Sequence, residues 1–330
     1  MRACYKRFMR TLLRSVTVAG LLALLPVMGH GEPVEVDVTP ILLVNGKPDE
    51  RTVGDLTYRG GLHLVSRDQR FGGFSALGLS ADGRRMISIS DAAVSFAAEL
   101  EHDENGNLSG LRNADLNVLA DRDGSALRGK YWTDAEAMSP GVEGEIIVAF
   151  ERDHRLWRYD PGSTVPRVLR PPDELSAMGD NDGIEALTLL HDGRLLAISE
   201  GSPDEPVRVG WVSGRNGWEV LTYAASDGFR PTGAATLPSG DVVVLERFYT
   251  PRAGVRIRIM RVRARDISAG AKVEGTLLAH FAPPMNIDNF EGIEAIPGPG
   301  GKTYLYIISD DNFNRREQRT LLMKFELTGG

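Results

Sequence analysis

The stretch NDGIEALTLLHDGRLLAISE, residues 181–200, holds two apolar runs separated by a tight turn. Asp192-Gly193 between the runs is typical of a two-residue hairpin, which predicts two antiparallel strands at about 184–190 and 194–200. The first run opens with Glu185 and the second closes with Glu200. The question is whether these carboxylates form a site or are only the solvated ends of a sheet.

The same plan recurs at four other places in the chain. Each unit has a loop, a polar residue, a short apolar strand, a turn that contains glycine, a second apolar strand and an acid at its end. The units are GGFSALGLSADGRRMISISD (72–91), TDAEAMSPGVEGEIIVAFER (133–152), the opening stretch, RPTGAATLPSGDVVVLER (230–247) and NFEGIEAIPGPGGKTYLYIISDD (289–311). The polar positions are Ser75, Glu136, Glu185, Thr232 and Glu291, and the terminal acids are Asp91, Glu151, Glu200, Glu246 and Asp310.

The spacing of these units predicts the fold. Successive polar positions lie 61, 49, 47 and 59 residues apart, and strand-only repeats of this length are typical of a β-propeller. We predict an all-β fold of five blades, with the N-terminal stretch 55–66 supplying the fourth strand of the last blade and closing the ring. A sixth, irregular blade that includes residues 34–44 is the alternative. No long amphipathic helix is evident, which argues against an α/β fold.

The first residues are typical of a secretory signal peptide. Basic residues without an acid precede a short apolar run broken by Pro26, and small residues follow it at Gly29 and Gly31. We predict a signal peptide over 1–29, an N-terminal extension over 30–54 and one propeller domain over 55–330. The apolar run is too short to favour a permanent anchor, so we expect a periplasmic or secreted protein without a membrane span after cleavage.

Composition excludes several classes of function. The one cysteine, Cys4, lies inside the predicted signal, which excludes thiol catalysis and cysteine metal sites. Removal of the five basic residues of that signal changes the formal net charge from −7 to −12. An acidic exported domain is a poor candidate for nucleic acid or anionic lipid. We expect a monomer that takes a small molecule or a protein of the cell envelope as its partner.

Several motifs together resemble a known family. GFSAL, DAEAM, GIEAL, VVVLER, DNFEGIEAI and IISDDNF are similar to motifs of the phytase-like domain family of exported bacterial proteins, named for esterase-like activity of phytase. The resemblance covers roughly residues 55–328 and is strongest over 288–313. It implies a β-propeller with a central acidic site and phosphoester or ester hydrolysis. The family's acid-glycine pair is kept only at Glu291-Gly292, because alanine follows Glu136 and Glu185.

The first strand of each propeller blade lines the central channel, so the recurring polar positions are expected at one mouth of it. Glu136, Glu185 and Glu291 are our candidate catalytic residues and metal ligands. Such carboxylates repel one another unless they are protonated or bind a cation. An oxygen-only set suits Ca²⁺ or Mg²⁺, which can polarise a phosphate or activate a water. Asp182 and Asp288, just before two ring positions, could add metal ligands.

A second group closes the second strands and is our candidate for substrate binding. It consists of Arg152, Arg247, Asp310, Asp311 and Asn312. The arginines could recognise a phosphate or carboxylate bidentately. Acids beside arginines at strand ends also link blades, and both interpretations stay open for the two groups. The regular occurrence of the terminal acids makes Glu200 the better candidate for a structural role and Glu185 the better candidate for function.

Other catalytic chemistries have no support in the sequence. The histidines are scattered without a zinc spacing, Ser75 does not lie in the serine-hydrolase elbow, and no nucleotide-binding glycine pattern occurs. Two functions remain: a metal-assisted hydrolase of phosphoesters or esters, and a non-catalytic propeller that binds a ligand or an envelope protein.

Overall fold

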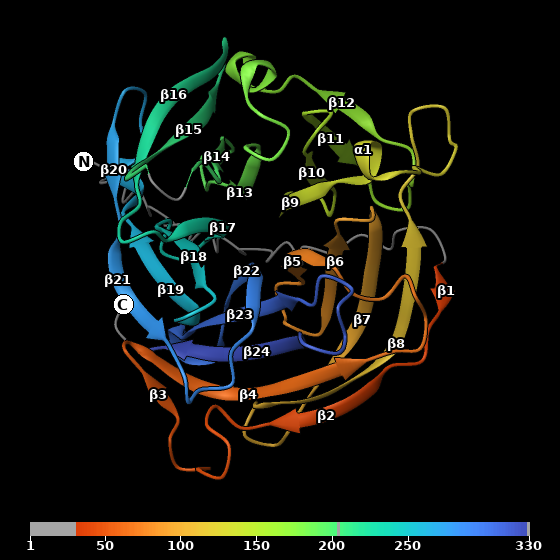
Figure 1. Cartoon of the computed structure of the whole chain (residues 1–330), viewed down its shortest axis with the longest axis vertical. Helices are drawn as coiled ribbons and strands as arrows, with labels where there is room; N and C mark the ends of the chain where they lie inside the picture. The colour runs from red at the N-terminus through yellow and green to blue at the C-terminus, as the bar shows by residue number, and fades with distance from the viewer. Residues whose placement is uncertain (1–30, 203–204, 329–330) are drawn as a thin grey trace, which may run out of the picture.

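The computed structural model describes residues 31–202 and 205–328, and in this part of the chain five sheets are arranged in a ring (Figure 1). Four strands form the body of each sheet, ordered from the centre of the ring outward. They are β5 (Phe74–Leu79), β6 (Arg85–Ser90), β7 (Val94–His102) and β8 (Leu108–Val118) in blade 1; β9 (Ala135–Pro140), β10 (Ile146–Phe150), β11 (Arg155–Tyr159) and β12 (Arg167–Leu169) in blade 2; β13 (Ile184–Leu189), β14 (Leu195–Ser199), β15 (Val207–Gly214) and β16 (Gly217–Ala224) in blade 3; β17 (Arg230–Thr236), β18 (Val242–Thr250), β19 (Gly254–Val262) and β21 (Thr276–Phe281) in blade 4; and β22 (Asn289–Pro297), β23 (Thr303–Asp310), β24 (Thr320–Leu327) and β4 (Leu56–Val65) in blade 5. The predicted five-bladed propeller is confirmed.

The ring closes as predicted, through the N-terminal strand β4. β4 pairs antiparallel with β24, so both ends of the propeller chain meet in blade 5. The stretch offered as part of a sixth blade forms β2 (Asp37–Ile41), which only adds a strand to the outer edge of β4, so that alternative was wrong. Short strands complete the edges: β1 (Glu32–Pro33) on β8, β3 (Thr52–Val53) on β4, and β20 (Lys272–Glu274), parallel to β16. The predicted signal peptide lies outside the described residues.

Apolar side chains fill the space between each pair of neighbouring blades. Five buried clusters lie in the five joints, and each draws residues from two adjacent sheets. The inner strand β5 and the second strand β10 are buried along their whole length because they are packed on both faces. β19, with arginines between its apolar residues, buries Ile257 and Ile259 completely, as the period-two alternation predicts.

Helices are few and short. They are α1 (Lys130–Thr133) and the 3₁₀ turns Asp173–Ala177, Ala264–Asp266 and Pro299–Gly301. None of the helices in the described part of the chain has the length and apolar character needed to cross a membrane. α1 directly precedes β9 and brings Lys130 to the mouth of the channel, where it contacts the acids described below.

Candidate functional site

The recurring polar position is a β-bulge in every blade. The pairing of the first and second strands skips one residue on each inner strand, and the skipped residues are Ser75, Glu136, Glu185, Thr232 and Glu291. A bulge bends the strand and redirects the side chain of the extra residue. The sequence repeat therefore marks a real structural position, although nothing in the spacing indicated that it would be a bulge.

The three bulge glutamates lie close enough to affect one another's charge. Burial and the charge of Glu185 raise the pKa of Glu136 well above its ordinary value. Burial, then the charges of Glu200 and Glu151, likewise raise the pKa of Glu185. Burial raises the pKa of Glu291, although Arg247 opposes the effect. These three residues therefore lie near one another at one end of the channel.

The hydroxyl residues at the remaining ring positions behave differently. Thr232 Oγ1 donates a hydrogen bond to the Phe290 carbonyl at 3.1 Å, which ties blade 4 to blade 5. Ser75 borders a cavity of only about 10 Å³ together with Glu185, Glu291 and the apolar side chains of Leu77 and Leu187. Apolar side chains thus fill the channel just below the ring, and the carboxylates are accessible from one face of the propeller.

Three acids approach closely enough to share a cation. Asp134, Glu136 and Glu151 each offer one oxygen, and these oxygens all lie within 4.8 Å of one another. An all-oxygen set suits Ca²⁺ or Mg²⁺. Of the predicted metal ligands only Glu136 belongs to this trio. Sequence reasoning missed Asp134, although its position two residues before a ring glutamate was visible in the motif TDAEAM.

Lys130 balances part of the negative charge of this trio. Its ammonium group forms ion pairs with Asp134 and, at 2.7 Å, with Asp91, and it lies 4.0 Å from Glu136 Oε1. A divalent cation bound by the trio would have to share these oxygens with Lys130 or displace it. No pattern in the sequence pointed to this lysine, because it comes from α1, ahead of the repeated unit that begins at residue 133.

The acids that end the second strands lie on the same face and mostly connect neighbouring blades. Glu200 Oε1 lies 2.7 Å from Arg230 Nη1, the first residue of the next blade's inner strand. Glu151 Oε1 accepts a hydrogen bond from the Gly183 amide at 2.6 Å. Burial raises the pKa of Glu151 to about 8, and the Gly183 amide opposes this. Glu151 thus links two blades and also belongs to the trio of acids, so a structural contact and a place in the candidate site occur in one residue.

Most of the predicted substrate-binding residues are held by short hydrogen bonds to other residues of the protein, and Arg247 is the exception. Arg152 Nε donates to Asp134 Oδ2 and supports the trio. Asp310 accepts hydrogen bonds from the side chain of Asn289 and the amide of Asn312, and Asp311 accepts one from the Gly73 amide in blade 1. Arg247 lies between Glu200 and Glu291, at 3.9 and 3.7 Å from their Oε1 atoms. Arg247 therefore differs from the others in lacking a close partner.

The two additional predicted metal ligands lie apart from the trio. Asp182 is half-buried, and its charge raises the pKa values of both Glu151 and Glu200. Asp288 lies in the cleft between blades 4 and 5, where Arg319 Nε is 3.4 Å from its Oδ2. Asp182 stays near the mouth as a neighbouring charge, whereas the carboxylate of Asp288 is held by Arg319.

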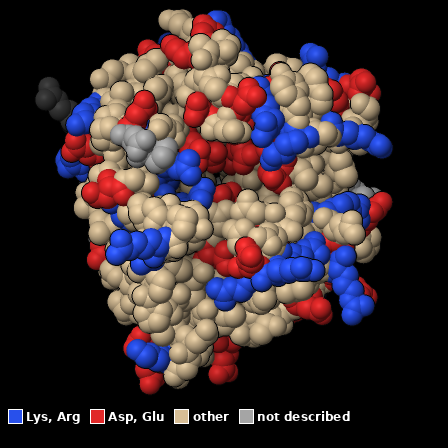
Figure 2. All heavy atoms as spheres, viewed as in Figure 1, with Lys and Arg blue, Asp and Glu red and all other residues tan. Residues whose placement is uncertain are grey.

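The charges gather visibly at the mouth. Figure 2 shows Asp and Glu side chains clustered around the hollow at the centre of this face, with Lys and Arg side chains beside them. Among the residues named above, acids outnumber bases, so burial and mutual repulsion together favour either protonation or a bound cation. The chemistry of this donor set fits a hard divalent ion.

The chain is similar to one known family and to several solved structures. No curated protein matches the chain. Among solved structures, virginiamycin B lyase from Staphylococcus aureus is 10% identical, with a TM-score of 0.38, and the match covers 83% of this chain and 85% of that chain. A protein of unknown function from Dyadobacter fermentans is 12% identical, with a TM-score of 0.45 and coverage of 92% and 97%. Residues 69–313 match the phytase-like family, described as esterase-like activity of phytase, and the chain belongs to that family.

Proposed function

We propose that this protein is a hydrolase of phosphoesters that depends on a divalent cation held at the acidic mouth. The observation that carries the proposal is the close approach of Asp134, Glu136 and Glu151, whose oxygens lie within 4.8 Å of one another. The family description, esterase-like activity of phytase, supports hydrolysis of this general kind. The predicted signal peptide supports action outside the cytoplasm, in the periplasm or after secretion.

Glu185 supports a catalytic use of this mouth. Its side chain is 9% exposed, yet it has neither a hydrogen bond nor an ion pair with any residue in the described ranges. A buried carboxylate without a partner is costly, so a fold retains it more readily when it binds a ligand or moves a proton. A raised pKa suits a general base, because the carboxylate then takes up a proton more readily at neutral pH.

Each residue then has a definite task. Asp134, Glu136 and Glu151 hold the cation, and Arg152 fixes the orientation of Asp134. When bound, the cation would polarise a phosphoryl oxygen and lower the pKa of a nearby water. Glu185 accepts the proton of the attacking water, whose oxygen forms the new bond to phosphorus while the bond to the alcohol oxygen breaks. Carboxylic esters are the second substrate class for the same groups.

A non-catalytic binding propeller is the alternative function. One observation favours it: several mouth residues are occupied in joining blades, as Thr232 and Glu200 are. In that case the acidic mouth would bind a cation or a basic group of a partner from the cell envelope without hydrolysing anything. The two functions differ in turnover and not in cation binding.

The test is hydrolysis of an aryl phosphate and an aryl ester, with Ca²⁺, with Mg²⁺ and with a chelator. We expect cation-dependent activity that falls about 100-fold or more in Glu185→Gln, since a general base contributes roughly 10²–10⁴-fold. Asp192→Asn, in the hairpin turn at the other end of β13, is the matched control and should keep full activity. Activity unaffected by Glu185→Gln would remove Glu185 from the mechanism. Cation binding without turnover of either ester would favour the binding propeller.

A further inference from the structure

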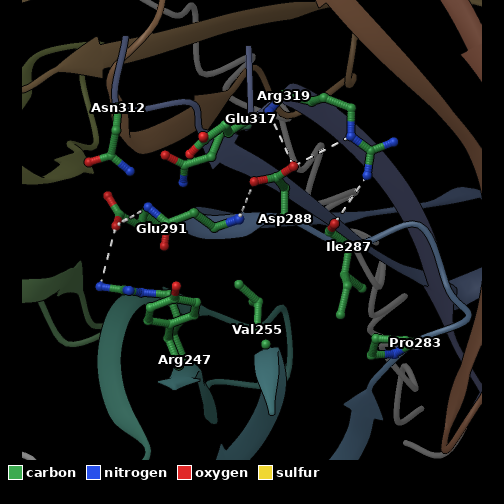
Figure 3. A pocket seen from close by; sticks show the side chains of 13 residues that line it. Arg247, Val255, Pro283, Ile287, Asp288, Glu291, Asn312, Glu317 and Arg319 are labelled. Carbon is green, nitrogen blue, oxygen red and sulfur yellow. Dashed lines mark hydrogen bonds and ion pairs between the residues drawn. The ribbon is translucent and has the colours of Figure 1, made fainter. Parts of the chain in front are cut away.

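A cleft lies beside the acidic mouth, between blades 4 and 5 (Figure 3). Its volume is about 770 Å³, within the range of about 300–1,000 Å³ that is usual for small-molecule sites. Glu291 and Arg247 belong both to its lining and to the rim of the mouth. A molecule in the cleft would therefore reach the ring carboxylates at one of its ends.

Arg247 makes only long ion pairs at that end of the cleft. Its guanidinium lies 3.7 Å from Glu291 and 3.9 Å from Glu200, both longer than a hydrogen bond. Its buried Nε also has no hydrogen-bond partner among the described residues. A planar guanidinium with unused donors matches the paired oxygens of a phosphate or carboxylate.

The second arginine of the cleft, Arg319, is already occupied. Its guanidinium donates to Asp288 Oδ2, to Asn286 Oδ1 and to the Ile287 carbonyl, as Figure 3 shows for Asp288. Glu317 and Glu291 add negative charge to the lining. Of the two described arginines that line the cleft, Arg247 is thus the one with unused hydrogen-bond donors. The acids around it favour a ligand with one anionic group over a ligand with several.

The wall that leads away from Arg247 contains apolar surface. Tyr249 lies two residues along β18 from Arg247, and a two-residue step on a strand returns to the same face. Tyr249 is 57% exposed and is paired across the hairpin with Val255 on β19. Pro283 and Ile287 lie in the opposite wall. An exposed aromatic ring beside apolar residues suits an organic group of aromatic size.

We propose that this cleft selects phosphate monoesters with a single phosphate and an apolar, aromatic-sized alcohol portion, and that Arg247 is the residue that binds the phosphate. The inference rests on the proposed function and specifies its substrate. The phosphate lies at Arg247 beside the ring carboxylates, and the organic group lies along Tyr249. The acids that line the cleft beside Arg247 disfavour a compound that carries several phosphates.

The experiment measures binding without turnover. Phenylphosphonate, whose carbon–phosphorus bond is not hydrolysed, is titrated calorimetrically into the full chain and compared with tripolyphosphate. We expect Arg247→Gln to weaken binding about 10- to 100-fold, the range for a hydrogen-bonded charge. Arg247→Lys should retain part of the affinity, and Tyr249→Ala should lose about 2- to 10-fold. Arg215→Gln, an exposed arginine in the β15–β16 turn, is the control and should bind like the wild type.

Three results would overturn the inference. The first is that phenylphosphonate does not bind the wild type. The second is that Arg247→Gln and Arg247→Lys, with melting temperatures like that of the wild type, bind phenylphosphonate as tightly as the wild type does, and the third is that tripolyphosphate binds the wild type more tightly than phenylphosphonate does. Phenyl phosphate hydrolysis is followed in parallel, so the two proposals fail separately. If phenylphosphonate binding depends on Arg247 but phenyl phosphate is not hydrolysed, the proposed function is contradicted and the proposed binding role of the cleft is supported. If phenyl phosphate hydrolysis is unchanged in Arg247→Gln and Arg247→Lys, the proposed binding role of the cleft is contradicted and the proposed function is supported.

Discussion

Asp311 Oδ1 accepts a hydrogen bond from the Gly73 amide at 3.0 Å and so joins the last blade of the ring to the first. The same oxygen accepts the Phe313 amide at 3.1 Å, and the residue is only 3% exposed. A propeller has no free sheet edges once its ring is closed, and the joint between its first and last blades completes that closure. This hydrogen bond lies in that joint, at the same face as the acidic mouth.

Asp311→Ala should destabilise the protein, because the buried amide of Gly73 and the part-buried amide of Phe313 lose their acceptor. We expect a loss of about 2–4 kcal/mol in the free energy of unfolding, at roughly 1–2 kcal/mol for each amide. Asp311→Asn keeps an oxygen in place and should lose less than half as much. Urea denaturation followed by circular dichroism measures both variants. Equal stability of Asp311→Ala and wild type would show that this hydrogen bond does not strengthen the closure.

Gly292→Ala should also destabilise the protein, through close packing between blades 5 and 1. A Cβ at residue 292 would lie 2.8 Å from the carbonyl carbon of Ala76 and 2.9 Å from the amide nitrogen of Leu77. These are backbone atoms of β5, so the blades must separate, at a cost of about 1–3 kcal/mol. Gly214→Ala is the matched control, since its Cβ would meet only ordinary contacts at 3.5 Å and beyond. Melting temperatures that fall equally for both variants would contradict this explanation.

The buried carboxyl group of Glu294 should make the free energy of unfolding depend on pH. Burial raises the pKa of Glu294 from 4.5 to about 8, although the Ala295 amide donates to its carboxylate. Because the folded protein holds this proton more tightly than the unfolded chain, its stability falls as pH rises from about 4.5 to about 8 and then levels off. The full effect is at most about 5 kcal/mol, at about 1.4 kcal/mol for each pKa unit.

Glu294→Gln cannot titrate and should reduce that slope by up to about 1.4 kcal/mol per pH unit within the window. Urea denaturation at a series of pH values from 5 to 9 measures the slopes of variant and wild type. Asp192→Asn should keep the wild-type slope. A Glu294→Gln slope equal to that of the wild type would mean that the carboxyl group titrates normally in the folded protein.

Local patterns made most of the fold predictable. The hairpin turns at Asp82-Gly83, Asp192-Gly193 and Ser239-Gly240 lie between apolar runs, and each produced the expected strand pair. The number of strands then required the N-terminal stretch to complete the last blade. The positions of β2 and β20 at the outer edges of blades 5 and 3 could not be foreseen, because their partners lie elsewhere in the sequence and their own burial is slight.

Only those site residues that occupy a position of the sequence repeat could be predicted. Glu136, Glu185 and Glu291 share one repeat position, and the fold brings them to one mouth. Lys130 lies in α1 and Asp134 directly follows that helix, so the approach of both to Glu136 depends on the path of the chain between α1 and β9. Glu185 has no hydrogen bond or ion pair among the described residues, whereas Thr232 donates to the Phe290 carbonyl in the next blade. The repeat did not predict this difference, because it depends on how neighbouring blades pack.

We infer that Asp134, Glu136 and Glu151 bind a divalent cation. The most direct measurement of this binding compares the melting temperature in Ca²⁺ or Mg²⁺ with the melting temperature in chelator. We predict that the wild type gains about 2.7 kcal/mol of stability when the ion exceeds its dissociation constant 100-fold. Asp192→Asn should show the same gain. Glu136→Gln should melt no lower than the wild type in chelator, because glutamine is uncharged and replaces a carboxyl group whose charged form is disfavoured by burial and by Glu185. It should show little gain in the ion. The same rise in Glu136→Gln as in the wild type, or no rise in either protein with either ion, would contradict the claim.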